Sequence, residues 1–142
     1  MKERYIEATQ EAGIALFSRK ITGEVIMLNL LRFRKVADYT KNPELTPSVP
    51  ISGRDAYKKY IDHTLPFLKE SGGSIVFIGE GGKYLIGPQD EEWDMVLLIR
   101  QKSVTDFVSF ASNQKYLAGI GHRTAALEDS RLLPLVEVNM PM

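Results

Sequence analysis

The stretch GEVIMLNLLRFR, residues 23–34, decides how this chain folds. Between Val25 and Phe33 every side chain is apolar except Asn29 and Arg32, a composition typical of a strand covered on both faces. Because side chains alternate along a strand, one face carries Val25, Met27, Asn29, Leu31 and Phe33, and the other carries Ile26, Leu28, Leu30 and Arg32. One face can be covered by the chain's own helices, and the other most simply by a second copy of the sheet.

The segments that follow predict alternating helices and strands. Ser52 opens a capping box ahead of a helix with one apolar face, and Gly72 ends that helix. A second capping box at Ser103 opens a shorter helix, and an interrupted helical turn follows over residues 113–123. Further strands are predicted at residues 74–79, 83–86, 93–100 and 132–138, the last of them with Pro134 as the mark of an edge strand.

This order, β-α-β-β-α-β, predicts an α+β domain with the ferredoxin-like arrangement. Right-handed crossovers place both main helices on one face of a four-stranded antiparallel sheet. The opposite face is apolar and bare, so we expect a homodimer whose sheet faces stack, which is a dimeric α/β barrel. We expect a single domain over residues 1–142, with a helical extension at 1–22 (helix over 3–18), a core at 23–138 and a long loop at 35–51.

Composition argues against several classes of function. The 18 basic residues are balanced by 18 acidic ones, which is not the charge pattern of a nucleic-acid-binding protein. Cysteine is absent, which excludes disulfides and thiolate metal sites and favours a reducing, intracellular compartment. No apolar run approaches the ~20 residues of a membrane span, and the first residues lack the apolar core of a signal peptide. We therefore expect a soluble, cytoplasmic protein.

Four strings of residues together resemble one known family. They are MLNLLRF at 27–33, GRDAYKKY at 53–60, WDMVLLIR at 93–100 and HRTAALEDSRLL at 122–133. As a set they are similar to the domain of unknown function 1330 family, which belongs to the dimeric α+β barrel superfamily. The resemblance implies a ferredoxin-like dimer with a cavity between the sheet and the helices of each subunit, and it implies no established activity. The chain departs from the family in its longer loop at 35–51 and in the acidic run just before Trp93.

Asn29, His122 and Arg123 are the candidate catalytic residues. Burying a carboxamide costs about 1–3 kcal/mol unless it is paired, so Asn29 either bonds to backbone or buried water, or is a polar hook in a ligand cavity. His122 is suited to proton transfer near neutral pH, and Arg123 beside it can hold a carboxylate or an enolate oxygen. In the structural alternative Arg123 pairs with Asp129, and His122 has no chemical role.

Four further residues are candidates for substrate binding: Tyr57, Tyr60, Trp93 and Asp94. The tyrosines lie on the first long helix, and the other two open the third strand. Aromatic rings at such positions usually belong to the core, and the alternative is a flat aromatic pocket. We expect no metal site, because two separated histidines among scattered carboxylates match neither a zinc nor a non-haem iron constellation.

Three functions fit these residues. The first is a cofactor-independent enzyme acting on a small organic molecule, with His122 as base and with Asn29 and Arg123 as oxyanion or carboxylate partners. The second is haem binding or degradation, because Asn29, Trp93 and His122 resemble in type and order a trio of haem-degrading superfamily members. The separation of Trp93 from His122 is longer here than in those proteins. The third function is non-enzymatic, as a dimer that binds a metabolite or has a structural role.

Overall fold

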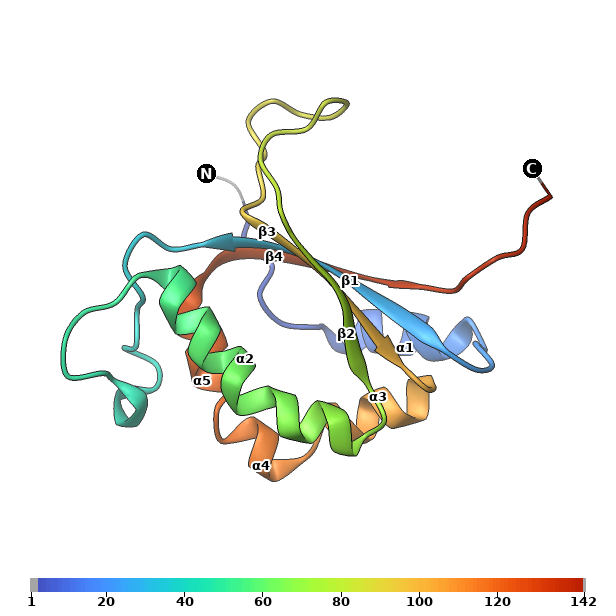
Figure 1. The fold of residues 1–142 in the computed structure, drawn as a ribbon, viewed down its shortest axis with the longest axis horizontal. Helices are drawn as coiled ribbons and strands as arrows, with labels where there is room; N and C mark the ends of the chain where they lie inside the picture. Colours follow the sequence, from blue (N-terminus) through green and yellow to red (C-terminus); the bar gives the residue numbers. More distant parts are fainter. Residues whose placement is uncertain (1–2, 142) are drawn as a thin grey trace.

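The strand β1 (Val25–Phe33) lies at the centre of the fold and has the bounds that its sequence predicts (Figure 1). The structure is a computed structural model that describes residues 3–141. β1 pairs with β3 (Met95–Gln101) and with β4 (Leu127–Leu135), and β3 pairs in turn with β2 (Ser74–Glu80). All three pairings are antiparallel, and the strand order β2-β3-β1-β4 is that of a ferredoxin-like sheet.

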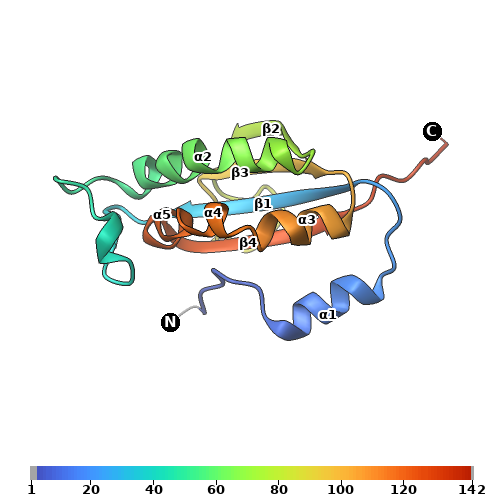
Figure 2. The same ribbon diagram turned by 90° about the horizontal axis from the view of Figure 1, so that it is seen from below.

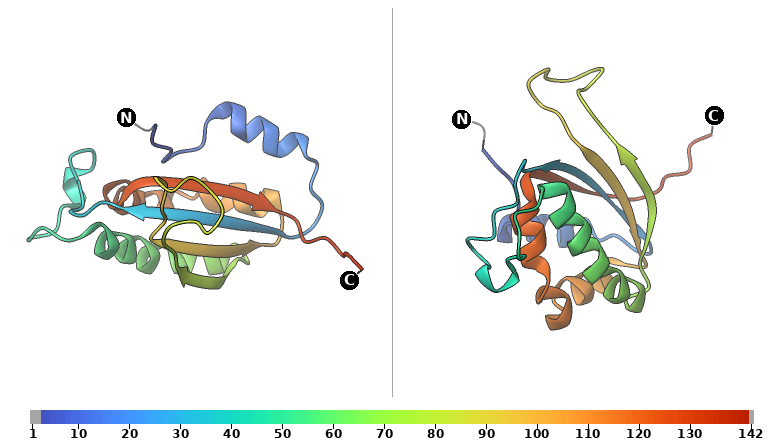
Figure 3. Two further views of the ribbon diagram at one scale, coloured as in Figure 1. Left: turned by 90° about the horizontal axis from the view of Figure 1, so that it is seen from above. Right: turned by 60° about the vertical axis from the view of Figure 1, so that its left-hand side comes forward.

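Helices cover one face of the sheet and leave the other face open (Figures 1 and 2). The covering helices are α2 (Gly53–Glu70), α3 (Val104–Ala111), α4 (Gln114–Leu117) and α5 (Ile120–Ala126), and the long loop contains the 3₁₀ turn η1 (Pro43–Leu45). α1 (Gln10–Ser18) is shorter than the helix predicted over 3–18 and lies beside the β4 edge of the sheet (Figures 2 and 3). Within residues 3–141 no helix combines the length and the apolar character that a membrane span requires.

Local sequence explains where the two main helices begin and where the first one ends. The Ser52 side chain accepts a hydrogen bond from the Asp55 amide, and the Ser103 side chain accepts one from the Asp106 amide. Each bond satisfies an amide that the first helical turn leaves without a partner, so both predicted N-caps are confirmed. Beyond α2 the chain turns at Gly72, whose φ of 84° is the left-handed conformation that favours glycine.

Burial along β1 alternates as the period-two pattern predicts. Val25, Met27, Asn29 and Leu31 are buried beneath the helices, and Ile26, Leu28 and Leu30 are half-buried on the open face. Asn29 lies opposite Leu97 on β3 and Leu132 on β4. The carboxamide therefore belongs to the face of the sheet that the helices cover.

The strand predicted at residues 83–86 is absent. Lys83 makes only an isolated bridge with Glu92, and Leu85 and Ile86 are 96% and 91% exposed. Glycines on both sides of this short apolar run let the chain leave the sheet. The result is a hairpin arm, residues 81–94, which connects β2 to β3 and projects from the open side of the sheet (Figure 1).

β4 begins at Leu127, earlier than the predicted strand at 132–138, because its polar residues have partners that the sequence does not reveal. The Asp129 carboxylate accepts a hydrogen bond from the Tyr5 amide at 2.8 Å, and the Ser130 hydroxyl donates one to the Tyr5 carbonyl. The N-terminal segment around Tyr5 therefore lies along β4 and satisfies side chains that look solvent-exposed in the sequence.

Candidate functional site

A cavity of about 250 Å³ lies between the sheet and the helices that cover it. Its floor is the helix-facing side of the sheet, and its walls come from α2, the helices α3 to α5 and the N-terminal segment. Most of the lining is apolar, including Met27, Leu68, Ile75, Ile99 and Phe110. A concave, mainly apolar site with a few polar groups is the usual form of a small-molecule site.

A second and more open hollow, of about 390 Å³, is lined by the N-terminal segment and the long loop. Charges of both signs line it, with Arg4, Arg34 and Lys41 among Glu3, Glu7 and Asp38. None of the residues proposed for catalysis or substrate binding from the sequence lines this hollow. The smaller apolar cavity is therefore the candidate site.

Two side-chain amides lie on the floor of the cavity. Asn29 is 6% exposed and its amide nitrogen donates a hydrogen bond to the Met27 carbonyl at 3.2 Å. Gln101, at the end of β3, is 1% exposed, and its carbonyl oxygen accepts a long hydrogen bond of 3.4 Å from the Ser71 hydroxyl. Asn29 thus has the backbone partner that a buried carboxamide needs, and it also lines the cavity.

Three tyrosines form the aromatic wall. Tyr57 and Tyr60 come from α2 and their ring centroids are 5.2 Å apart, while the Tyr60 hydroxyl is hydrogen-bonded to that of Tyr116 on α4 at 2.7 Å. Burial, followed by the neighbouring Tyr60, raises the pKa of Tyr57 and of Tyr116 well above the ordinary value of 10.0. The phenols of Tyr57 and Tyr116 therefore stay protonated at neutral pH and are poor acids.

Thr64 on α2 adds a polar atom that has no partner. Its hydroxyl oxygen is buried and makes no hydrogen bond within the described residues 3–141, although the residue lines the cavity. A buried hydroxyl without a partner costs about 1–3 kcal/mol relative to one that is hydrogen-bonded. A polar group of a bound molecule would remove that cost.

Arg123 on α5 brings a positive charge to the cavity lining. One guanidinium nitrogen donates a hydrogen bond of 2.6 Å to the carbonyl of Ile6 in the N-terminal segment. No carboxylate of residues 3–141 lies within ion-pair distance of Arg123, and the alternative partner Asp129 is bound instead by Arg131 at 2.7 Å. The guanidinium charge acts on the aromatic wall, where it opposes the rise in the pKa of Tyr57 and Tyr116.

His122 does not line the cavity, although it is the neighbour of Arg123 in the chain. Its Nδ1 atom is 2.8 Å from the hydroxyl of Tyr39 in the long loop, and the two rings meet edge to face. Burial, followed by the electrostatic influence of Lys59 and His63, lowers the pKa of His122 below 6.5. The side chain is thus a neutral contact between α5 and the long loop at pH 7.

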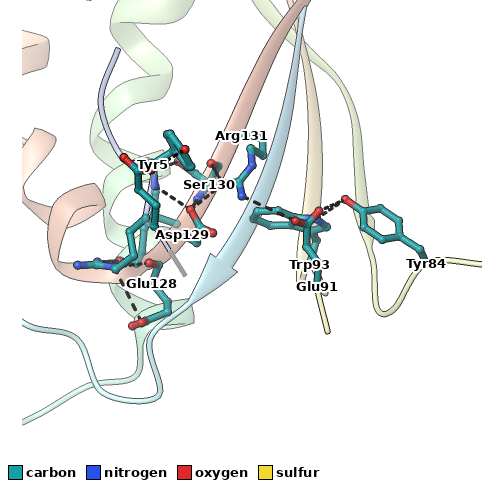
Figure 4. Close-up of polar contacts among 11 residues, drawn as sticks. Tyr5, Tyr84, Glu91, Trp93, Glu128, Asp129, Ser130 and Arg131 are labelled. Carbon is teal, nitrogen blue, oxygen red and sulfur yellow. Dashed lines mark hydrogen bonds and ion pairs between the residues drawn. The ribbon is translucent and has the colours of Figure 1, made fainter. Parts of the chain in front are cut away.

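Trp93 belongs to a separate polar cluster that joins the hairpin arm to β4 (Figure 4). The Arg131 guanidinium lies between two rings, 5.0 Å from the centroid of Trp93 and 4.7 Å from that of Tyr5. The Trp93 indole donates to the Tyr84 hydroxyl at 2.7 Å, and that hydroxyl donates to Glu91 at 2.6 Å. These contacts hold the base of the arm against the sheet.

Asp94 also makes a structural contact, with the backbone of β1. Its carboxylate accepts a hydrogen bond from the Phe33 amide at 2.8 Å, at the end of β1. Neither Asp94 nor Trp93 lines the cavity. Of the residues predicted from the sequence, the cavity therefore brings together Asn29, Tyr57, Tyr60 and Arg123, and it excludes His122, Trp93 and Asp94.

The sequence analysis did not identify the polar cavity residues Thr64, Gln101 and Tyr116, nor the acidic Glu7. Gln101 follows the predicted end of the third strand, yet it continues the face that carries Leu97 and Ile99. Extending the alternation by one residue would have found it. The spacing of Thr64 predicts it on the apolar face of the first long helix, with Tyr57 and Tyr60, but not that its hydroxyl lacks a partner. Tyr116 carries no such signal, because an isolated tyrosine on a helix is ordinary.

The trio that suggested haem is dispersed. Asn29 lies in the cavity, Trp93 lies in the polar cluster at the arm, and His122 contacts the long loop. Among residues 3–141 no group of three or more His, Cys, Asp or Glu side chains is placed to hold a metal ion.

Two crystal structures of the RPA0582 protein resemble this chain over nearly its whole length. The structure described as a protein of unknown function from Rhodopseudomonas palustris is 34% identical, with a TM-score of 0.83, and the match covers 97% of this chain and 100% of that one. The methylated form of RPA0582 is 35% identical, with a TM-score of 0.82 and 96% coverage of both chains. No protein-family model matches the sequence, and no curated protein is detectably similar to it.

A dimeric ferredoxin-like protein of unknown function from Bacteroides fragilis is a more distant match, 15% identical over 79% of this chain with a TM-score of 0.46. The similarity to RPA0582 is much closer, because about a third of the residues are identical over almost all of both chains. This chain belongs to the same family as the RPA0582 protein of Rhodopseudomonas palustris.

Proposed function

We propose that this protein binds a small organic molecule in the cavity between its sheet and α2, and that it does so as a homodimeric member of the domain of unknown function 1330 family. The observation that carries the binding proposal is the composition of the cavity. Apolar and aromatic walls enclose two amides, an unpartnered Thr64 hydroxyl and a guanidinium without an acidic partner among the described residues. Of these groups, the amides have hydrogen-bond partners, whereas a buried hydroxyl without a partner is costly inside a protein unless something binds it.

Catalysis is a further part of this proposal. Arg123 and Asn29 both line the cavity and can stabilise negative charge on an oxygen of the bound molecule, which is the role predicted for them. His122, the predicted base, contacts Tyr39 outside the cavity. Because His122 lies outside the cavity, His122→Gln should keep both ligand binding and any turnover. A folded His122→Gln protein that binds ligand but has lost turnover would mean that His122 reaches the bound molecule.

The dimer is proposed from the open face of the sheet. Its centre is apolar, with Leu28 and Leu30 of β1 beside Leu98 of β3, and two large side chains at its sides, Phe77 and Leu133, are each 53% exposed. Apolar patches of this kind are unusual on the surface of a monomer. A second copy stacked on this face would cover them, and the hairpin arm, which projects from the same side, would extend over the partner (Figure 1).

A thermal-shift screen tests the binding proposal. The library contains haemin, quinones, short keto acids, coenzyme A thioesters, and aromatic and aliphatic acids with their neutral amides. A ligand at 100 times its Kd adds about 2.7 kcal/mol to the free energy of unfolding and visibly raises the melting temperature. Haemin is included because the haem alternative predicts that it gives the largest shift.

A cavity-blocking variant shows where a ligand binds. Ala111 lines the cavity at the end of α3, so Ala111→Phe fills part of the space and should abolish the shift. Ala12 is exposed on α1, so Ala12→Phe is the matched control and should keep it. A shift that survives in Ala111→Phe, or no shift with any compound, would contradict the proposed function.

A further inference from the structure

We infer that the molecule bound in this cavity is a small monocarboxylate with an apolar body, and that Arg123 binds its carboxylate. This inference rests on the proposed function and names its ligand class. It starts from the environment of Arg123, the charged residue of α5 that lines an otherwise apolar and aromatic space.

Arg123 forms no ion pair with the described residues around the cavity. Its hydrogen bond to the Ile6 carbonyl occupies one guanidinium nitrogen, and no acidic side chain of residues 3–141 forms an ion pair with it. A guanidinium presents a planar set of five N–H donors that matches a carboxylate with two parallel hydrogen bonds. Arg131 and Arg34, by contrast, each have a carboxylate partner.

The cavity limits the number of charges on the ligand. Among residues 3–141, Glu7 is the only other charged residue of the lining, and it is acidic. A second carboxylate on the ligand would therefore face Glu7 or lie in the lining without a second cationic side chain of these residues to pair with, and both are unfavourable. The site thus favours a single negative charge.

The volume and the walls define the body of the ligand. A protein cavity of about 150 Å³ accommodates benzene, so a space of about 250 Å³ accommodates about ten non-hydrogen atoms. The aromatic wall of Tyr57 and Tyr60 suits a flat ring. Thr64, whose buried hydroxyl has no partner among the described residues, also lines this space.

Matched pairs of acids and amides test the inference without any mutation. We would measure the Kd of 4-hydroxybenzoate and 4-hydroxybenzamide, of phenylacetate and phenylacetamide, and of octanoate and octanamide by calorimetry at pH 7. Within each pair the shape is nearly constant and only the charge changes. At least one acid should bind ten or more times as tightly as its amide, and terephthalate, a dianion, should bind more weakly than 4-hydroxybenzoate.

Two arginine variants assign the effect to one residue. Arg123→Met should remove the preference for the acid, and Arg123→Lys, which keeps the charge but loses the planar fork, should keep only part of it. Arg19→Met is the matched control, because Arg19 also donates to a backbone carbonyl, that of Pro134, and does not line the cavity. Circular dichroism identifies a variant that has not folded, and the wild-type comparison stands without the variants.

The outcomes separate this inference from the function on which it rests. If amides or other neutral compounds bind as tightly as the acids and Ala111→Phe abolishes their binding, the cavity function stands and the carboxylate inference is wrong. An acid preference that Arg123→Met retains also overturns the inference. If nothing binds in the cavity at all, both proposals fail.

Discussion

Thr64 has the unpartnered hydroxyl among the residues that line the cavity. Its hydroxyl is buried without a hydrogen-bond partner in the part of the chain that the structure describes, whereas the hydroxyl of Thr124 on α5 donates to the Ile120 carbonyl. Threonine and valine have nearly the same shape and similar helix propensities. Replacing either residue by valine therefore changes mainly the polar group.

We predict that Thr64→Val raises the free energy of unfolding of the ligand-free protein by about 1 kcal/mol, because it removes an unsatisfied buried hydroxyl. Thr124→Val, as the control, should give no gain. Urea denaturation of both variants measures the difference. A Thr64→Val protein less stable than wild type would mean that the hydroxyl has a partner or that the cavity is hydrated.

His122 gives the protein a predicted dependence on pH. Burial, and after it Lys59 and His63, lowers the pKa of His122 below 6.5, so the unfolded chain takes up a proton at a higher pH than the folded one. The stability contributed by neutral His122 is complete above pH 6.5 and is lost as the pH falls towards the folded pKa. The free energy of unfolding of wild type should therefore decrease between pH 7.5 and 5.5.

Replacing the imidazole isolates this effect. In His122→Gln the free energy of unfolding should fall less over the same interval, because the other titrating groups are unchanged. Urea denaturation at the two pH values, for both proteins, gives the comparison. Parallel decreases in wild type and variant would show that His122 titrates alike in the folded and unfolded chains.

At the scale of elements, one glycine allows α2 to begin where β1 ends. Gly53 donates its amide to the Arg34 carbonyl at 3.0 Å, and a Cβ atom added to it would lie 2.3 Å from that oxygen and 2.6 Å from the Ala126 carbonyl. These neighbours are backbone atoms, which cannot move aside easily. The first turn of α2 can therefore pack against the ends of β1 and α5 only because residue 53 has no side chain.

We predict that Gly53→Ala lowers the free energy of unfolding by about 1–3 kcal/mol, the usual cost of forcing extra atoms into packed structure. Gly13 of α1 is the opposite case, because nothing lies within 4 Å of its added Cβ. Gly13→Ala should therefore stabilise the protein by about 0.5–1 kcal/mol through the higher helix propensity of alanine. Chemical denaturation measures both, and equal effects would contradict the contact geometry at Gly53.

Local sequence patterns predicted the elements in which the polarity of each residue matches its burial. β1 and both N-caps follow from alternation and from the side chains of Ser52 and Ser103. The pattern failed at residues 83–86, where Leu85 and Ile86 are apolar but exposed, and at the start of β4, where Asp129 is polar but buried. Asp129 is buried because the N-terminal segment, which is distant in sequence, covers it. Leu85 and Ile86 are exposed because the hairpin arm leaves the sheet, which a local pattern does not reveal.

The same limit applies to the candidate site. The alternation of side chains along β1 was enough to place Asn29 on one defined face of the strand. Helical spacing placed Tyr57 and Tyr60 on the apolar face of α2, and all three residues line the cavity. His122 was grouped with Arg123 because they are adjacent in sequence. Neighbours on a helix point about 100° apart, and here one contacts the long loop while the other lines the cavity.

At the scale of the whole molecule, the open sheet face predicts self-association. Sedimentation equilibrium should show a dimer at micromolar concentration, and Leu28→Glu, which places a charge at the centre of that face, should give a folded monomer. Val108→Glu is the control, since Val108 lies on α3 on the helical side and is already 38% exposed. A monomeric wild type, or a dimeric Leu28→Glu, would exclude this face as the interface.

We propose that a small molecule binds in the cavity between the sheet and the helices, and nuclear magnetic resonance can locate it there. A ¹H–¹⁵N correlation spectrum would be recorded while the strongest ligand from the screen is added. The side-chain amide signals of Asn29 and Gln101, both in the cavity lining, should move with saturation, while that of the exposed Gln89 on the hairpin arm should stay in place. Saturable shifts confined to the arm or to the long loop, with Asn29 and Gln101 unchanged, would contradict the account.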